Sequence, residues 1–74
     1  MTQAEYDLVD IVNALRDIRI QANLSQKDLA KLTGMNRRQY ISFETLEHMP
    51  RLDTFMNVVD KFGYKVVLVP KDSE

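Results

Sequence analysis

Residues 24–44, LSQKDLAKLTGMNRRQYISFE, decide the fold of this chain. The stretch contains two capping boxes, in which the N-cap side chain and the side chain three residues later each accept a hydrogen bond from the other residue's backbone N–H group. The two pairs are Ser25 with Asp28 and Asn36 with Gln39. Gly34 lies between them and can adopt the positive φ that ends a helix. Two helix starts around one glycine stop predict a helix-turn-helix, with helices at about 26–33 and 37–46.

Arg37 and Arg38 occupy the first turn of the second of these helices. Cations are slightly unfavourable there, because the helix macrodipole places partial positive charge at the N-terminus. An arginine pair at this place suits a helix that presents its start to an anion, and a guanidinium can bond a guanine edge bidentately. The alternative is a solvated surface pair of little energetic weight. The helix-turn-helix context favours nucleic acid.

The chain resembles the Cro/C1 (XRE-type) helix-turn-helix family over roughly residues 11–63. The matching residues are Leu24-Ser25-Gln26, Leu29-Ala30, Gly34, Tyr40 with Ser42, Glu44, Leu52-Asp53-Thr54-Phe55 and Phe62-Gly63. The resemblance implies a mostly α, lambda-repressor-like bundle of about four helices. The sequence departs from the family just after Glu44, where a glycine is common and this chain has Thr45-Leu46-Glu47.

The resemblance also implies roles for single residues. Gln26 matches a glutamine that bonds DNA phosphate, while Arg37, Arg38 and Ser42 match positions that read base edges. The expected DNA-binding residues are Gln26, Lys27, Asn36, Arg37, Arg38, Gln39, Ile41 and Ser42. Arg19 and Glu44 match a structural pair that joins the first helix to the recognition helix.

Two residues of the recognition helix leave alternatives open. Ile41 lies on the face of Arg37 and Ser42, where it either contacts a thymine methyl group or is an incidental exposed residue. Tyr40 is expected to pack inward with its hydroxyl reaching the surface. The alternative for Tyr40 is an aromatic contact to DNA.

Charge is spread unevenly along a chain whose net charge is −1. Residues 25–51 carry five Lys and Arg against three Asp and Glu, whereas the segments on either side are acidic. The basic third is therefore the one with the helix-turn-helix, and its small excess predicts modest phosphate affinity per subunit. A chain of 74 residues forms one domain, 1–74, with a small core. Pairing of two subunits would offset both the modest phosphate affinity and the small core.

The flanking segments predict two more helices and one strand. Thr2 with Glu5 opens a helix at about 3–22, and another runs over about 52–62 until Gly63 stops it. Residues 64–70, YKVVLVP, are rich in β-branched side chains and end at a proline, which predicts a strand. Since both of its faces are apolar, we expect it to pair with its copy across a homodimer two-fold axis. The expected dimer-interface residues are Tyr64, Val66, Val67, Leu68 and Val69. The alternative is a tail packed on its own helices.

A helix-turn-helix domain closed by a dimerising strand resembles the HipB-like antitoxins. This resemblance implies a sequence-specific DNA-binding transcriptional repressor that binds a palindromic operator as a dimer and represses its own operon. It also implies a cognate toxin as a second partner, and a cytoplasmic location on the nucleoid. The alternative is a protein-interaction module that neutralises a toxin or a phage regulator, with DNA binding secondary.

Other classes of function find no support in the sequence. We expect no enzyme, because no nucleophile–histidine constellation, paired metal ligands or glycine-rich phosphate loop is present. We expect no cofactor and no metal, since the chain lacks cysteine and His48 has no second histidine. No apolar run approaches the ~18 residues of a membrane span. The acidic N-terminal segment does not resemble a secretory signal.

Overall fold

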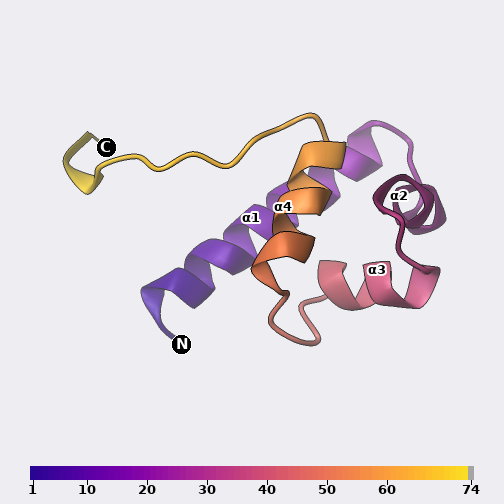
Figure 1. Cartoon of the computed structure of the whole chain (residues 1–74), viewed down its shortest axis with the longest axis horizontal. Coiled ribbons are helices and arrows are strands. Elements are labelled where there is room, and N and C mark those ends of the chain that lie inside the picture. Colours follow the sequence, from indigo (N-terminus) through magenta and orange to yellow (C-terminus); the bar gives the residue numbers. More distant parts are fainter. Residues whose placement is uncertain (74) are drawn as a thin grey trace.

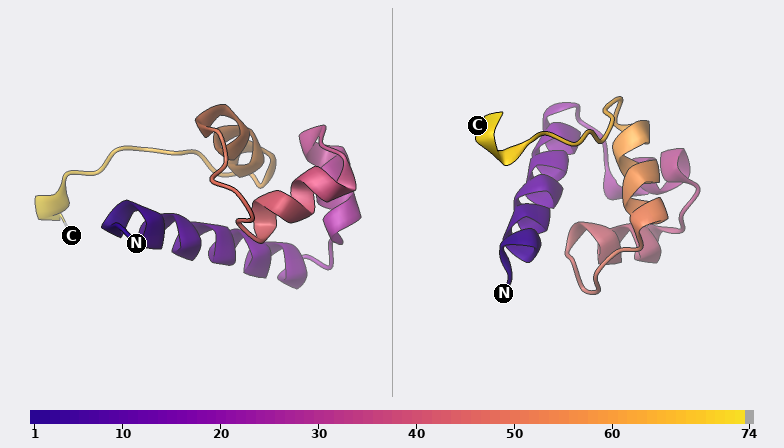
Figure 2. Two further views of the ribbon diagram at one scale, coloured as in Figure 1. Left: turned by 90° about the horizontal axis from the view of Figure 1, so that it is seen from below. Right: turned by 60° about the vertical axis from the view of Figure 1, so that its left-hand side comes forward.

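Four helices form the body of the molecule (Figure 1), and the computed structural model describes residues 1–73. They are α1 (Gln3–Gln21), α2 (Gln26–Thr33), α3 (Arg37–Glu44) and α4 (Leu52–Lys61), followed by a single 3-10 turn, η1 (Lys71–Ser73). Helix α1 is the longest and runs along one side, while the other three helices lie against its middle and its C-terminal half (Figure 2). The expected mostly helical fold with four helices is confirmed.

Capping boxes begin the first three helices, as the sequence predicts. The side-chain oxygens of Thr2, Ser25 and Asn36 accept from the backbone N–H three residues later at 3.2, 3.0 and 2.8 Å. In each case the reciprocal bond from the N-cap N–H to the third side chain is also present. These bonds satisfy backbone donors that a helix start leaves without partners. Helix α4 begins after Arg51 without a side-chain cap.

All four helices end in the same backbone motif. The residue after each C-terminal turn has a positive φ: 59° at Asn23, 75° at Gly34, 53° at Leu46 and 86° at Gly63. The next N–H then donates to a carbonyl five residues back, as in the Schellman motif. These bonds are Leu24 to Arg19, Met35 to Ala30, Glu47 to Ser42 and Tyr64 to Val59, at 2.9–3.1 Å.

Leu46 is the unusual member of this set, because a left-handed conformation is costly for a residue with a branched side chain. Its side chain packs against the hydrophobic core, and this contact offsets the backbone strain. The turn at Leu46 ends α3 at Glu44, so the expected end near residue 46 was wrong. The chain thus leaves α3 through the left-handed turn that a glycine commonly provides.

The core consists of two buried apolar residues from each helix. They are Val12 and Leu15, Leu29 and Ala30, Tyr40 and Phe43, and Val58 and Val59. Tyr40 is only 1% exposed, so the expectation that its hydroxyl reaches the surface was wrong. A bond of 2.9 Å from the Asn57 amide to the Thr33 carbonyl adds a polar link between α4 and the end of α2.

Residues 64–70 form an extended tail, and the expected strand is not present in this single chain. A strand needs a hydrogen-bonded neighbour, and apart from the Tyr64 N–H bond to Val59 that ends α4, none of the other described residues bonds to the tail as a neighbouring strand. The alternative of a tail packed on its own helices is not seen either, since exposure runs from 45% at Val66 to 99% at Leu68.

Across residues 1–73, no helix combines the length and apolar character needed to cross a membrane.

Gly34 offers a test of the turn between α2 and α3. A Cβ at this position would meet no heavy atom within 4 Å, so Gly34→Ala adds backbone strain without a steric clash. We expect a loss of ~1–2 kcal/mol in the free energy of unfolding, measured by urea denaturation. Gly34→Asn should cost less, because asparagine tolerates the left-handed region. Equal stability of the alanine variant and the wild type would contradict the account of this turn.

Candidate nucleic-acid interface

An ion pair between α1 and α3 holds α3 in place. The Arg19 guanidinium donates from Nε to Glu44 Oε2 and from Nη2 to Glu44 Oε1, both at 2.8 Å. The two side chains are 12% and 3% exposed, so the pair is largely withdrawn from water. Arg19 Nη1 also donates to the Leu24 carbonyl at 2.9 Å. A bidentate, buried pair of this kind fixes geometry more firmly than a surface ion pair.

The polar groups around this pair shift one another's ionisation. Burial by itself raises the pKa of Glu44, but hydrogen bonds from Arg19 and Tyr40 outweigh it and hold the pKa below the usual 4.5. The bond to Glu44 raises the pKa of Arg19 above its usual value. Burial, and then the neighbouring Glu44 carboxylate, raise the pKa of the Tyr40 phenol well above its usual value. Glu44 is therefore a carboxylate, and Tyr40 a neutral phenol, at neutral pH.

The first turn of α3 differs from those of the other helices. Helices α1, α2 and α4 each carry an acidic residue there, as the macrodipole favours. Helix α3 has none and carries Arg37 and Arg38 instead. Both arginines are exposed, and within residues 1–73 neither forms an ion pair. The start of α3 therefore offers two guanidinium groups, each with unsatisfied donors, to a ligand outside the chain.

The start of α2, which carries Gln26 and Lys27, lies next to the start of α3. An open hollow of about 540 Å³ is lined by Arg19, Ser25, Gln26, Lys27 and Arg37. The Gln26 amide donates to Glu44 Oε1 at 3.3 Å, and a primary amide has a second N–H to give. Lys27 and Arg37 bring two cationic side chains to this amide, while Glu44 balances the charge of Arg19 and no acidic side chain is part of the lining. Such a hollow suits a phosphate group.

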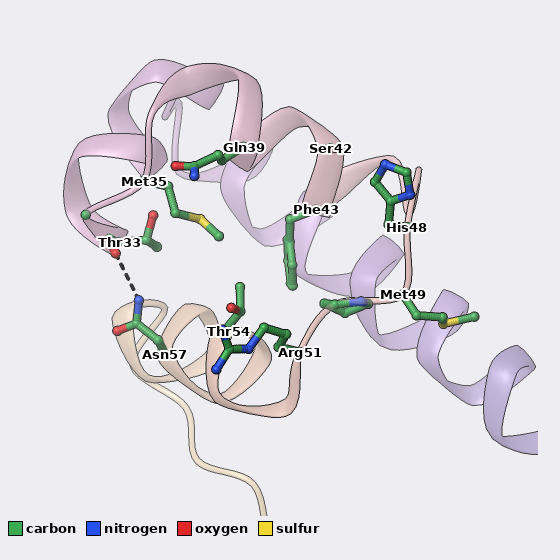
Figure 3. A pocket seen from close by; sticks show the side chains of 12 residues that line it. Thr33, Met35, Gln39, Ser42, Phe43, His48, Met49, Arg51, Thr54 and Asn57 are labelled. Carbon is green, nitrogen blue, oxygen red and sulfur yellow. Dashed lines mark hydrogen bonds between the residues drawn. The ribbon is translucent and has the colours of Figure 1, made fainter.

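Asn36 and Gln39 use their side-chain oxygens in the capping box of α3. Their amide nitrogens have no hydrogen bond within the described part of the chain, so both residues retain donors. Asn36 is exposed at the start of α3 beside the arginines. Gln39 instead borders a second hollow of about 480 Å³ between α3 and α4, where its side chain lies near Met35 (Figure 3).

His48 lies in the wall of this second hollow together with Phe43, at the end opposite Gln39 (Figure 3). Within residues 1–73, no group of three acidic or histidine side chains is arranged to hold a metal ion. No buried side-chain nitrogen or oxygen there lacks a hydrogen-bond partner. Among residues 1–73, the second hollow therefore contains no metal-binding cluster and no buried polar atom without a partner.

Ile41 and Ser42 follow the arginines on α3 and are both partly buried. The Ser42 hydroxyl donates to Glu47 Oε2 at 2.9 Å, so an acidic side chain stands next to an expected base-reading residue. Sequence reasoning missed Glu47, because the contact spans a non-helical turn that no helical periodicity describes. The signal that could have found it is the departure from the family just after Glu44.

The expected dimer-interface residues, Tyr64 and residues 66–69, lie in the exposed tail. The tail leaves the end of α4 and runs along the side of the molecule away from α3 (Figures 1 and 2). The structure therefore separates the tail from the start of α3, and a contact made by one would leave the other free.

Comparison with known proteins gives consistent matches. A family model described as helix-turn-helix matches residues 15–69. The cryptic phage CTXphi transcriptional repressor RstR of Vibrio cholerae is 27% identical over 60 residues, covering 81% of this chain and 54% of that protein. The chain thus spans about half the length of RstR. An uncharacterized HTH-type transcriptional regulator, MJ0272 of Methanocaldococcus jannaschii, is 33% identical over 64 residues, covering 84% of this chain and 97% of that protein.

A solved structure also matches the fold. A toxin-antitoxin module from Streptococcus pneumoniae superposes with a TM-score of 0.70 at 25% identity. The match covers 96% of this chain and 82% of that chain. The similarity therefore extends beyond the central helices to nearly the whole chain.

The lowered pKa of Glu44 predicts a pH dependence of stability. Because the folded-state pKa lies below the usual 4.5, the unfolded chain binds more protons as the pH falls through this window. The contribution of Glu44 is complete above about pH 4.5 and is lost as the pH falls through the folded-state pKa. Urea denaturation should show that the free energy of unfolding falls between pH 7 and pH 3, and that it falls less in Glu44→Gln. The same acid dependence in both proteins would rule out Glu44 as its source.

Proposed function

This chain belongs to the helix-turn-helix family whose model covers residues 15–69, and on that premise we propose that it is a sequence-specific DNA-binding transcriptional repressor that acts as a homodimer. The observation that carries the proposal is the start of α3, where Arg37 and Arg38 replace the acidic residue found in the first turn of every other α-helix among the described residues. This substitution opposes the macrodipole, so it costs stability. A ligand that supplies negative charge and base acceptors accounts for it.

Base reading in this proposal comes from the exposed start and face of α3. Arg37 and Arg38 donate to guanine edges in the major groove, and Ser42 follows one turn later. Ile41 lies beside them and supplies an apolar contact to a thymine methyl group. The opposite face of α3 is fixed to the core by Tyr40 and Phe43, so the reading face is held rigidly.

Phosphate contacts come from the neighbouring starts of α2 and α3. Gln26 and Lys27 line the basic hollow with Arg37, and Asn36 keeps a free amide donor beside it. Contacts to phosphate position a protein on the duplex without carrying sequence information. Gln39 also retains its amide donors, and like Ser42 it lines the hollow between α3 and α4.

Dimerisation in this proposal uses the tail. Tyr64 and residues 66–69 expose apolar side chains that a second copy would cover by pairing two strands across a two-fold axis. Two recognition helices would then enter successive major grooves about 34–36 Å apart on a palindromic operator. Because each subunit carries few cations, two subunits are needed for tight binding at physiological salt.

The antitoxin function is the finer part of the proposal. The structural match to a toxin-antitoxin module supports a HipB-like antitoxin that represses its own operon and binds a cognate toxin. The match to the phage transcriptional repressor RstR supports the repressor function, which by itself requires no toxin. Both functions place the protein on DNA in the cytoplasm, and both are regulatory rather than enzymatic. Co-purification with the product of the adjacent reading frame would distinguish them.

A second candidate is a protein-interaction module in which DNA binding is secondary, and the exposed apolar tail favours it. A gel shift on genomic fragments at several salt concentrations separates the two functions. Operator binding should weaken steeply as salt rises, because bound phosphates release counterions. Absence of a shift at low salt would favour the interaction module.

Arg38→Ala tests base reading. We expect selection from a randomised duplex library to return a motif that is relaxed at one position, with ~1–3 kcal/mol less discrimination there. Gln26→Ala should instead weaken binding to all sequences alike. Arg16→Ala, which removes an exposed arginine from α1, is the charge-matched control and should keep the wild-type motif. The wild-type motif at unchanged affinity in Arg38→Ala would contradict the role of this residue.

Val67→Asp tests the dimer. Val67 is 60% exposed in the single chain, so the change should leave the helical fold intact while placing a buried charge in the paired strands. We expect sedimentation to show a dimer for the wild type and for Val67→Thr, and a monomer for Val67→Asp. An intact dimer in Val67→Asp would remove the tail from the interface.

A further inference from the structure

Ser42 and Glu47 are joined by two hydrogen bonds at the end of α3. The Ser42 hydroxyl donates to Glu47 Oε2 at 2.9 Å, and the Glu47 backbone N–H donates to the Ser42 carbonyl at 3.1 Å. The second bond belongs to the turn at Leu46 that ends the helix. The Glu47 carboxylate therefore lies beside Ser42, on an exposed part of the chain.

This arrangement decides which hydrogen-bonding groups the end of α3 can offer. A serine hydroxyl has one hydrogen to donate, and that hydrogen is used by Glu47. What remains at Ser42 and Glu47 is a set of oxygen lone pairs, all of them acceptors. The start of α3 has the opposite character, since Arg37 and Arg38 can only donate.

We propose that Glu47, positioned by Ser42, is a specificity-determining residue that selects a base with an exocyclic amine in the major groove. The inference rests on the proposed function and extends it to a residue outside the recognition helix. Cytosine offers such a donor at N4 and adenine at N6, while guanine and thymine present acceptors at the corresponding edge. The carboxylate accepts from the amine and repels the acceptor oxygens of guanine and thymine.

The position of the selected base follows from the helix geometry. Ser42 lies four residues after Arg38, which is about 6 Å along the helix axis. Bases on one strand are about 3.4 Å apart, so with the axis of α3 along the groove this rise corresponds to about two base pairs from the guanine that Arg38 reads. A half-site thus combines guanine at the start of α3 with cytosine or adenine at its end.

A carboxylate at this place also weakens binding to DNA in general, and this effect can be used to test its role. Negative charge near the duplex opposes binding to every sequence, because the phosphate backbone dominates affinity. Glu47 therefore lowers affinity for DNA in general while raising discrimination among sequences. Replacing a residue with a merely structural role would not raise general DNA affinity while lowering discrimination among sequences.

The test compares selections from a randomised duplex library for the wild type, Glu47→Gln and Asp10→Asn. Glu47→Gln removes the charge and keeps an oxygen that can accept from Ser42. Asp10→Asn removes the same charge from an exposed position on α1 and is the matched control. The wild type should select guanine together with cytosine or adenine about two base pairs away, and the selected base identifies which amine is read.

We expect Glu47→Gln to keep the guanine and to lose on the order of tenfold preference at the amine-bearing position. We also expect it to bind a duplex without the motif more tightly than the wild type does, and Asp10→Asn to keep the wild-type motif. An unchanged motif in Glu47→Gln, weaker general binding, or the same relaxation in Asp10→Asn would overturn the role of Glu47 alone. A wild-type selection that returns no motif would overturn this inference and the proposed function together.

Discussion

The buried pair of Arg19 and Glu44 is the interaction on which the rest of this structure depends. Its two bonds of 2.8 Å join α1 to α3, and Gln26 adds a contact from α2 to the same carboxylate. Removing one partner would leave a buried charge unpaired, at a cost of about 3–5 kcal/mol. A core of eight apolar residues can pack in more than one way. The directional pair selects the arrangement in which the start of α3 projects from the molecule.

With α3 fixed in this manner, the start of α3 and the apolar tail lie on different sides of the molecule (Figure 1). On one side, Arg37 and Arg38 stand beside the basic hollow at the start of α2, with Tyr40 and Phe43 anchoring the helix behind them. The apolar tail lies on the side away from α3 (Figure 1). The proposed dimer contact of the tail and the proposed DNA contact of α3 would therefore not compete for surface. The exit turn at Leu46 adds a third element, because it places Glu47 beside Ser42 at the end of α3.

Local rules explain how much of this fold could be predicted from the sequence. Capping boxes and glycine stops depend only on residues three to five apart, so the helix starts at Ser25 and Asn36 and the stop at Gly34 could be predicted. The Arg19–Glu44 contact spans 25 residues, and only family resemblance suggested it. Tyr40 was misplaced because burial of its hydroxyl depends on the pair of Glu44 with Arg19, and Arg19 comes from another helix. A strand over residues 64–70 requires a partner chain, which a pattern within one sequence cannot supply.

The central claim is that the starts of α2 and α3 form the DNA-binding surface. The most direct measurement is an NMR titration of the ¹⁵N-labelled protein with a mixed-sequence duplex at low salt, where general binding is strongest. The account predicts that the backbone amide signals of residues 25–27 and 36–42 shift, together with the side-chain signals of Arg37 and Arg38. Signals of α4 and of the outer face of α1 should stay in place. Shifts confined to α1, α4 or the tail, or no shifts at all, would contradict it.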